Sequence, residues 1–241
     1  MISGPHNLWR TALTLSLLLL TPAARGQEGQ AGTTGGAPQG QATTAAPQAS
    51  ELDALKAEAM AFYKDRLKPA SAKKAIDAMA RWQVLDPGNP EPVLLEAKLI
   101  LFYLSYLRGT EDTDAREALV HQGLTHCREA YAKDPSNHGA DFFAAVMLAN
   151  WSREKGIMSS LSNYGEMTER MDRVEKNAPG YYYGGVDRFW GRVITQVPSS
   201  VRSLRGYDLQ DAIKMDQDAL KGSSSFRLTH YYLGQADIDN G

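Results

Sequence analysis

The sequence has little of what three classes of protein require. It contains a single cysteine, Cys127, so an internal disulfide is excluded and packing alone must hold the fold. Its longest basic run is the pair Lys73–Lys74, and the formal net charge is −2. Because phosphate neutralisation needs a basic surface, this balance argues against a nucleic-acid-binding protein.

The motifs that would indicate an enzyme are also missing. There is no Gly-x-Ser-x-Gly and no His-Glu-x-x-His, and Gly184-Gly185 lacks the spaced third glycine of a dinucleotide loop. His121 and His126 are spaced i, i+5, which separates them around a helix, whereas ligands on one face need i, i+4. We therefore expect no catalytic residues, no metal site and no cofactor.

The start of the chain has the pattern of a secretory signal over residues 1–26. Arg10 supplies the positive charge, Thr11–Leu20 is the apolar segment, and Ala24-Arg25-Gly26 resembles a cleavage site. A retained membrane anchor is the alternative, but about 20 apolar residues are needed to span a bilayer. No cysteine that could carry a lipid follows. We expect a mature protein in the periplasm or another exported compartment.

Residues 27–49 are mostly Gly, Gln, Thr, Ala and Pro, which predicts a disordered linker because they bury too little surface to offset their ordering entropy. A helical domain is expected over 50–241. Apolar periodicity, cap residues and Pro or Gly stops predict nine helices and no strand. Their expected ranges are about 50–67, 71–85, 90–109, 113–133, 139–155, 159–177, 186–197, 208–222 and 225–238.

Helix-stop signals recur after every second helix. DPGNP begins at Asp86, DPSN at Asp134, APGY at Ala178 and GSSS at Gly222. This spacing predicts an all-α, tetratricopeptide-like solenoid of about four helix pairs plus a terminal helix. An irregular helical bundle is the alternative. The third and fifth helices are apolar nearly all round and are expected to be central.

The segment NAPGYYYGGVDRFWG, which starts at Asn177, is unusual because three tyrosines precede two glycines. One interpretation is a hairpin corner packed against its neighbour. The other places Tyr181, Tyr182 or Tyr183 in a groove, since tyrosine combines an apolar ring with a polar tip. Arg188 either receives an anionic group or pairs with Asp187, Glu169 or Asp172 at the surface.

Three stretches resemble a known family. LANWSREKGIMSSL at Leu148–Leu161 and NAPGYYYGGVDRFWGRVITQVP at Asn177–Pro198 are similar to the T component (TatT-like) of tripartite ATP-independent periplasmic (TRAP) transporters. GYDLQDAIKMDQDAL, from Gly206, resembles another family stretch, with Tyr207 where an acidic residue is usual. The resemblance covers roughly residue 71 to the C-terminus, and Tyr-Gly-Gly-x-x-Arg is its most specific part.

The resemblance implies an all-helical periplasmic accessory protein that binds the transporter's solute-binding protein and forms homo-oligomers. It also implies an internal channel for a small hydrophobic or carboxylate ligand. The alternative function is a general cell-envelope scaffold for protein–protein interactions. The candidates for the channel, whose alternative role is core packing, are Tyr103, Tyr106, Phe142, Phe143, Trp151, Tyr181, Tyr182, Tyr183, Gly184, Gly185, Arg188 and Trp190.

Overall fold

The computed structural model describes residues 45–107 and 112–240, and within them every regular element is a helix. This confirms the all-α prediction. The expected signal and the linker as far as residue 44 lie outside the described residues. The helices are α1 (Ala45–Lys64), α2 (Pro69–Leu85), α3 (Glu91–Leu107), α4 (Thr113–Lys133), α5 (His138–Lys155), α6 (Ile157–Asn177), α7 (Tyr181–Gln196), α8 (Ser199–Leu204), α9 (Leu209–Gly222) and α10 (Arg227–Asn240).

Side-chain caps explain why several helices begin where the sequence places them. The carboxylate of Asp112 accepts from the backbone N–H of Ala115 at the start of α4. Asp208 and Asp211 form a reciprocal capping box at the start of α9. Such caps satisfy backbone N–H groups that have no partner inside the helix.

The largest differences from the predicted helices concern α1, α7 and α8, and α7 begins at Tyr181 instead of about residue 186. α1 begins at Ala45 instead of about residue 50, and Pro47 lies in its first turn, where a missing N–H costs no helical hydrogen bond. The short helix α8 was not predicted. It follows Pro198 directly, and the sequence analysis treated that proline only as a stop for the preceding helix.

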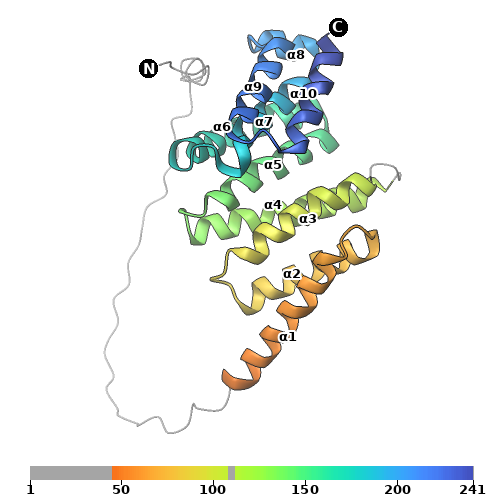
Figure 1. Ribbon diagram of the computed structural model, residues 1–241, viewed down its shortest axis with the longest axis vertical. Helices are drawn as coiled ribbons and strands as arrows, with labels where there is room; N and C mark the ends of the chain where they lie inside the picture. Colours follow the sequence, from red (N-terminus) through yellow and green to blue (C-terminus); the bar gives the residue numbers. More distant parts are fainter. Residues whose placement is uncertain (1–44, 108–111, 241) are drawn as a thin grey trace, which may run out of the picture. The chain divides into compact units, whose positions relative to one another are not determined.

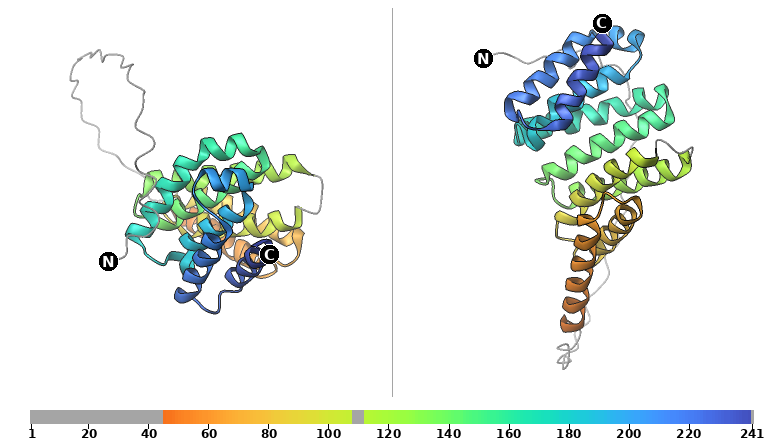
Figure 2. Two further views of the ribbon diagram at one scale, coloured as in Figure 1. Left: turned by 90° about the horizontal axis from the view of Figure 1, so that it is seen from above. Right: turned by 45° about the vertical axis from the view of Figure 1, so that its right-hand side comes forward.

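Helices that are neighbours in the chain pack together (Figures 1 and 2). From α1 to α7 each helix contacts the next, after which α7 packs against α9, and α9 against α10. A second set of contacts joins α3 to α5 and α5 to α7, and α10 also contacts α7. The elements α3, α5, α7 and α10 are thus linked in series, and this arrangement positions the site described below.

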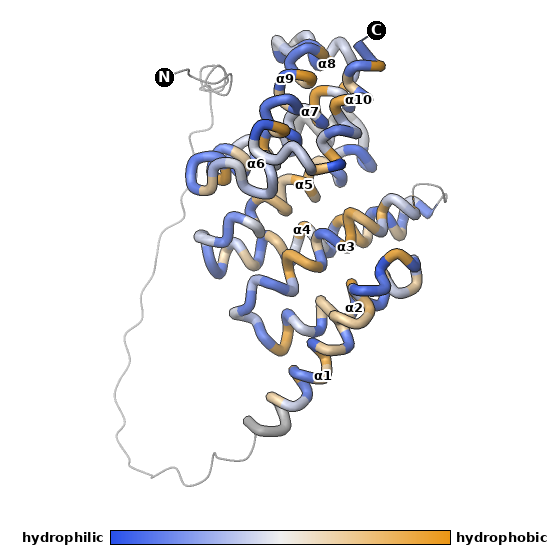
Figure 3. The backbone as a smooth tube through the Cα atoms, in the orientation of Figure 1, coloured by the Kyte–Doolittle hydropathy of each residue, from blue (hydrophilic) through white to orange (hydrophobic). Residues whose placement is uncertain are grey.

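The helices expected to be central are well buried. Hydrophobic residues run along much of α3 (Figure 3), and Val93, Leu99, Ile100 and Leu104 are buried in the core. In α5 nearly every residue from Gly139 to Leu148 is buried. The burial follows from packing on several sides, because α3 contacts α2, α4 and α5.

A buried carboxylate joins three helices. Glu96 of α3 is 1% exposed and accepts from Gln83 Nε2 of α2 at 2.6 Å and from Gln122 Nε2 of α4 at 2.6 Å. His126 Nδ1, also on α4, lies 2.7 Å from Glu96 Oε2. The hydrogen bond to Glu96 raises the pKa of His126 above its ordinary value, against the opposing effect of burial.

A second buried carboxylate joins α5 to α6. Asp141 is 1% exposed and accepts from Arg170 Nη1 at 2.7 Å and from Arg173 Nε at 2.8 Å. The charge-assisted hydrogen bonds compensate for removing the carboxylate from water. They also raise the pKa of Arg173 above its ordinary value.

Candidate functional site

The tyrosine segment contains a left-handed backbone turn at the beginning of α7. Tyr182 (φ 52°, ψ 49°), Tyr183 (φ 60°, ψ 52°) and Gly184 (φ 70°, ψ 36°) all have positive φ, and right-handed helix follows. A left-handed conformation costs roughly 1–2 kcal/mol for each residue that carries a Cβ. We call residues 181–185 the tyrosine turn. Its strain requires specific support from the surrounding structure.

Arg188 supplies part of that support. Its Nη2 donates to the carbonyl oxygen of Tyr182 at 2.7 Å, and its Nη1 donates to the carbonyl oxygen of Tyr183 at 2.8 Å. Nη1 also lies 3.3 Å from Thr229 Oγ1 of α10. The side chain is only 4% exposed, and burial lowers its pKa from the ordinary value. Arg188 therefore ties the turn to α10, and its hydrogen bonds go to these groups instead of the surface carboxylates considered in the sequence analysis.

The two glycines of the turn allow close contact with neighbouring helices. A Cβ at Gly184 would lie 2.7 Å from Cα and 2.8 Å from the carbonyl oxygen of Ala219 in α9. A Cβ at Gly185 would lie 2.8 Å from the ring of Phe142 in α5. All three distances are shorter than a contact between packed atoms, so a side chain at either position would force the helices apart.

Rings from three segments meet around the turn. We define the aromatic cluster as Phe142 and Phe143 of α5, Tyr181, Tyr182 and Tyr183 of the turn, and Phe226, which precedes α10. The ring centroid of Tyr182 lies 5.4 Å from that of Phe143 and 5.8 Å from that of Phe226. These separations are typical of attractive aromatic pairs.

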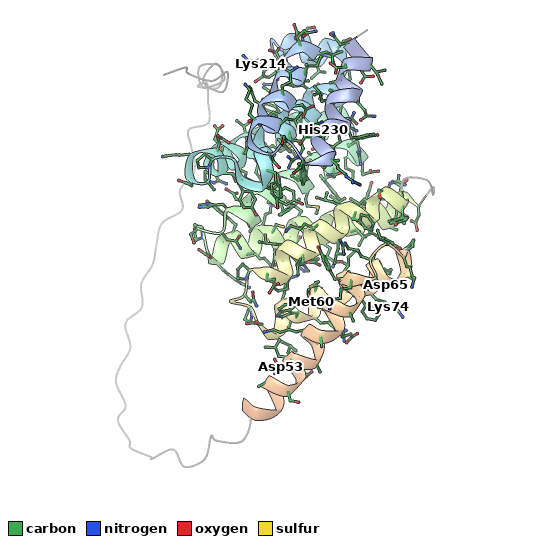
Figure 4. All side chains as sticks on the ribbon, viewed as in Figure 1. Asp53, Met60, Asp65, Lys74, Lys214 and His230 are labelled. Atoms are coloured by element: carbon green, nitrogen blue, oxygen red, sulfur yellow. The ribbon has the colours of Figure 1, made fainter. Side chains whose placement is uncertain are left out.

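The outer part of the cluster is accessible. Tyr183 stacks on Phe226 with ring centroids 5.0 Å apart, and Tyr183 is 56% exposed. The guanidinium carbon of Arg188 lies 4.3 Å from the ring centroid of Phe226. His230, labelled in Figure 4, has Nε2 2.6 Å from the carbonyl oxygen of Ser224, which anchors the segment that carries Phe226. The cluster thus reaches from the core to the surface.

Lys98 of α3 also belongs to this region, although the sequence analysis did not select it. Its Nζ lies 5.4 Å from the ring centroid of Tyr182 and 5.9 Å from that of Phe143. The side chain is half-buried, and burial lowers the pKa of its ammonium group. The signal that could have identified it is a lone cation within the apolar segment LLEAKLILF.

The remaining channel candidates lie elsewhere. Trp190 packs against Tyr164 of α6, with ring centroids 5.6 Å apart. Trp151 contacts His121 of α4 at 5.8 Å. Tyr106 donates its hydroxyl to the carbonyl oxygen of Leu67 at 2.7 Å and contacts Tyr103. Among the described residues no ring contact joins these four candidates to the aromatic cluster, which contains the other aromatic candidates.

In the described ranges no three His, Cys, Asp or Glu side chains gather where they could hold a metal ion. None of the described helices is both long and apolar enough to cross a membrane.

No family model matches the sequence, and a search of the curated proteins found no match.

Proposed function

We propose that the described helices form a tetratricopeptide-like solenoid of helical hairpins. The proposal is supported by the order of contacts, in which each helix packs on its chain neighbour while α3, α5 and α7 also contact one another in series. Stacked hairpins of this kind bury faces that a single hairpin leaves exposed, and they present one row of helices to a partner or ligand.

On this fold we propose a periplasmic accessory protein of a TRAP-type solute uptake system. It binds the system's solute-binding protein and a small hydrophobic or carboxylate ligand. The observation that carries the proposal is that Tyr-Gly-Gly-x-x-Arg, the most specific element of the family resemblance, forms one interlocked unit. Its tyrosine carbonyls bind Arg188, and its glycines contact α9 and α5.

The chemistry of the unit is that of a binding site. Aromatic rings and two cations, Lys98 and Arg188, lie together there. Such a surface favours an apolar ligand that bears a negative charge, because the rings contact its body and a cation can bind its anionic group. The proposal assigns no reaction to the protein.

The test is to recover the protein with its partners from the native cell envelope. A tagged protein, cross-linked in living cells, is purified and its partners are identified by mass spectrometry. The proposal predicts that a TRAP-type solute-binding protein is enriched with the wild type and is lost with Gly184→Ala, which disrupts the turn. Recovery of envelope-assembly proteins without any solute-binding protein would instead favour the scaffold function.

A further inference from the structure

Lys98 is a half-buried cation that has no anionic partner in the described part of the chain. Its ammonium group contacts the rings of Phe143 and Tyr182, and no described residue accepts a hydrogen bond from it or forms an ion pair with it. Glu96, on the same helix, does not neutralise it, because that carboxylate is bound by side chains of α2 and α4. Lys98 instead lies toward α5 and α7.

An uncompensated cation in such surroundings is unfavourable. Moving a charged group out of water costs free energy unless a partner compensates for the loss. Burial is the cause that lowers the pKa of Lys98, which agrees with the lack of a nearby carboxylate. An anionic ligand would supply the missing partner.

Tyr182 offers a second donor at the same place. Its ring lies beside Lys98, and its hydroxyl has no hydrogen-bond partner among the residues described. Burial is the main cause that raises the pKa of Tyr182, and the charge of Arg188 acts to lower it. Because Arg188 binds the carbonyl of Tyr182, the backbone that carries this donor is held in its left-handed conformation before any ligand arrives.

The geometry points to a carboxylate site formed by the ammonium of Lys98 and the hydroxyl of Tyr182. We propose that it binds a small monocarboxylate whose apolar body lies against the aromatic cluster. This inference rests on the proposed function and names the ligand class and the residues that recognise its charge.

A monoanion suits the site better than a phosphate. Arg188 is the other cation near Tyr182, but its guanidinium already donates to two carbonyl oxygens and Thr229. One ammonium and one phenol therefore remain to bind the ligand, which is too few for a dianion that accepts many hydrogen bonds. The neighbouring rings of Phe143 and Tyr182 favour an apolar body.

The test compares a carboxylate with its neutral amide. Hydrocinnamate and hydrocinnamamide have the same phenyl body and differ in charge, and their Kd values are measured by calorimetry on the full chain near neutral pH. We expect hydrocinnamate to bind more tightly than the amide. Lys98→Met keeps an apolar chain of similar length. It should raise the Kd for hydrocinnamate about tenfold or more and leave the Kd for the amide nearly unchanged.

Matched variants separate this role from folding. Lys98→Arg keeps the positive charge and should retain most of the preference for the carboxylate. Tyr182→Phe removes one hydroxyl and should raise the Kd for hydrocinnamate severalfold, because one hydrogen bond is lost. Lys214→Met is the control, since Lys214 is an exposed lysine of α9 (Figure 4) without a partner among the described residues. Far-ultraviolet circular dichroism checks that each variant folds.

Several outcomes would overturn the inference. One is that the wild type binds hydrocinnamate and hydrocinnamamide with equal affinity, and another is that it binds neither. A third is that Lys98→Met loses affinity for both probes to the same extent. Displacement of hydrocinnamate by inorganic phosphate would show a general anion site instead of one for monocarboxylates. If the wild type prefers the carboxylate but no solute-binding protein is recovered from the envelope, the proposed transport function is wrong and the carboxylate site is retained. If a solute-binding protein is recovered but the carboxylate is not preferred, only the carboxylate site is wrong.

Discussion

Asp216 of α9 carries the most quantitative prediction. Its side chain is 0% exposed, and neither carboxyl oxygen has a hydrogen-bond partner among the residues that the structure describes. The carboxyl group faces α7, where a Cβ at Gly191 would lie 3.1 Å from its Cγ. Arg188 and Arg192 are within electrostatic reach, but they donate to carbonyls of the tyrosine turn and to Gln235.

Burial raises the pKa of Asp216 from 3.8 to about 7, although both arginines act to lower it, and Asp187 adds a smaller upward effect. The folded protein therefore binds one more proton than the unfolded chain between these two values. The corresponding stabilisation is fully present below the unfolded pKa and is lost as the pH rises through the folded one. A shift of roughly three units corresponds to about 4 kcal/mol, at about 1.4 kcal/mol per unit.

Asp216→Asn tests this reasoning because it keeps the shape and removes the titration. The buried amide itself costs about 1–3 kcal/mol, but this cost does not change with pH. The free energy of unfolding of the variant minus that of the wild type should therefore increase by about 4 kcal/mol from about pH 4 to about pH 8. We expect the variant to be the more stable protein at the upper end.

The assay is urea unfolding followed by far-ultraviolet circular dichroism at a series of pH values. Asp218→Asn is the control, since Asp218 lies on the same helix and pairs with Lys221 near the surface. Its difference from the wild type should change little with pH. Parallel curves for Asp216→Asn and the wild type would refute the argument, because they would show that Asp216 titrates alike in both states.

Three further predictions concern stability. Gly184→Ala should lower the free energy of unfolding, measured by thermal unfolding, by several kcal/mol, because the new side chain has a positive φ and overlaps the α9 backbone. Gly234→Ala is the control and should not destabilise the protein, because open space surrounds that position. His126→Gln should lower the free energy of unfolding in urea more at about pH 6 than at about pH 8, because the contribution of a raised pKa is complete below the unfolded value of 6.5 and disappears above the folded one; an equal loss at both would contradict it. Asp141→Ala should cost about 3–5 kcal/mol by leaving buried Arg170 without this carboxylate. Asp77→Ala, at an exposed ion pair, should lower the free energy of unfolding by less than about 1 kcal/mol. Equal losses for Asp77→Ala and Asp141→Ala would contradict the stabilising role of the buried Asp141–Arg170 pair.

Much of the fold could be predicted from local patterns. The bounds of α4 match the expected range, and α2, α5 and α6 end at the expected residues Leu85, Lys155 and Asn177. Periodicity and caps depend on residues within a few positions of one another, so the chain alone contains them. The missed helix α8 is the counterexample, because a stretch of six residues carries too little periodicity to detect.

The candidate site could be predicted only in part. The unusual composition of the tyrosine segment identified Tyr182 and Arg188 as important, but it did not show that the arginine binds the backbone of the turn. Lys98 is a lone cation within an apolar helix, and the sequence analysis did not select it. Its position beside Tyr182 depends on how α3, α5 and α7 pack. Because Lys98 and Tyr182 are far apart in the sequence, no local sequence pattern contains both of them.

The sequence by itself determined an all-helical chain, most of its helix ends and the segment where rings and glycines concentrate, because these follow from short-range hydrogen bonding and side-chain spacing. The tertiary structure decided the left-handed turn, the burial of the Asp216 carboxyl group and the neighbours of Lys98. Each of these depends on which groups from distant helices replace water around a residue, and that replacement occurs only when the helices pack.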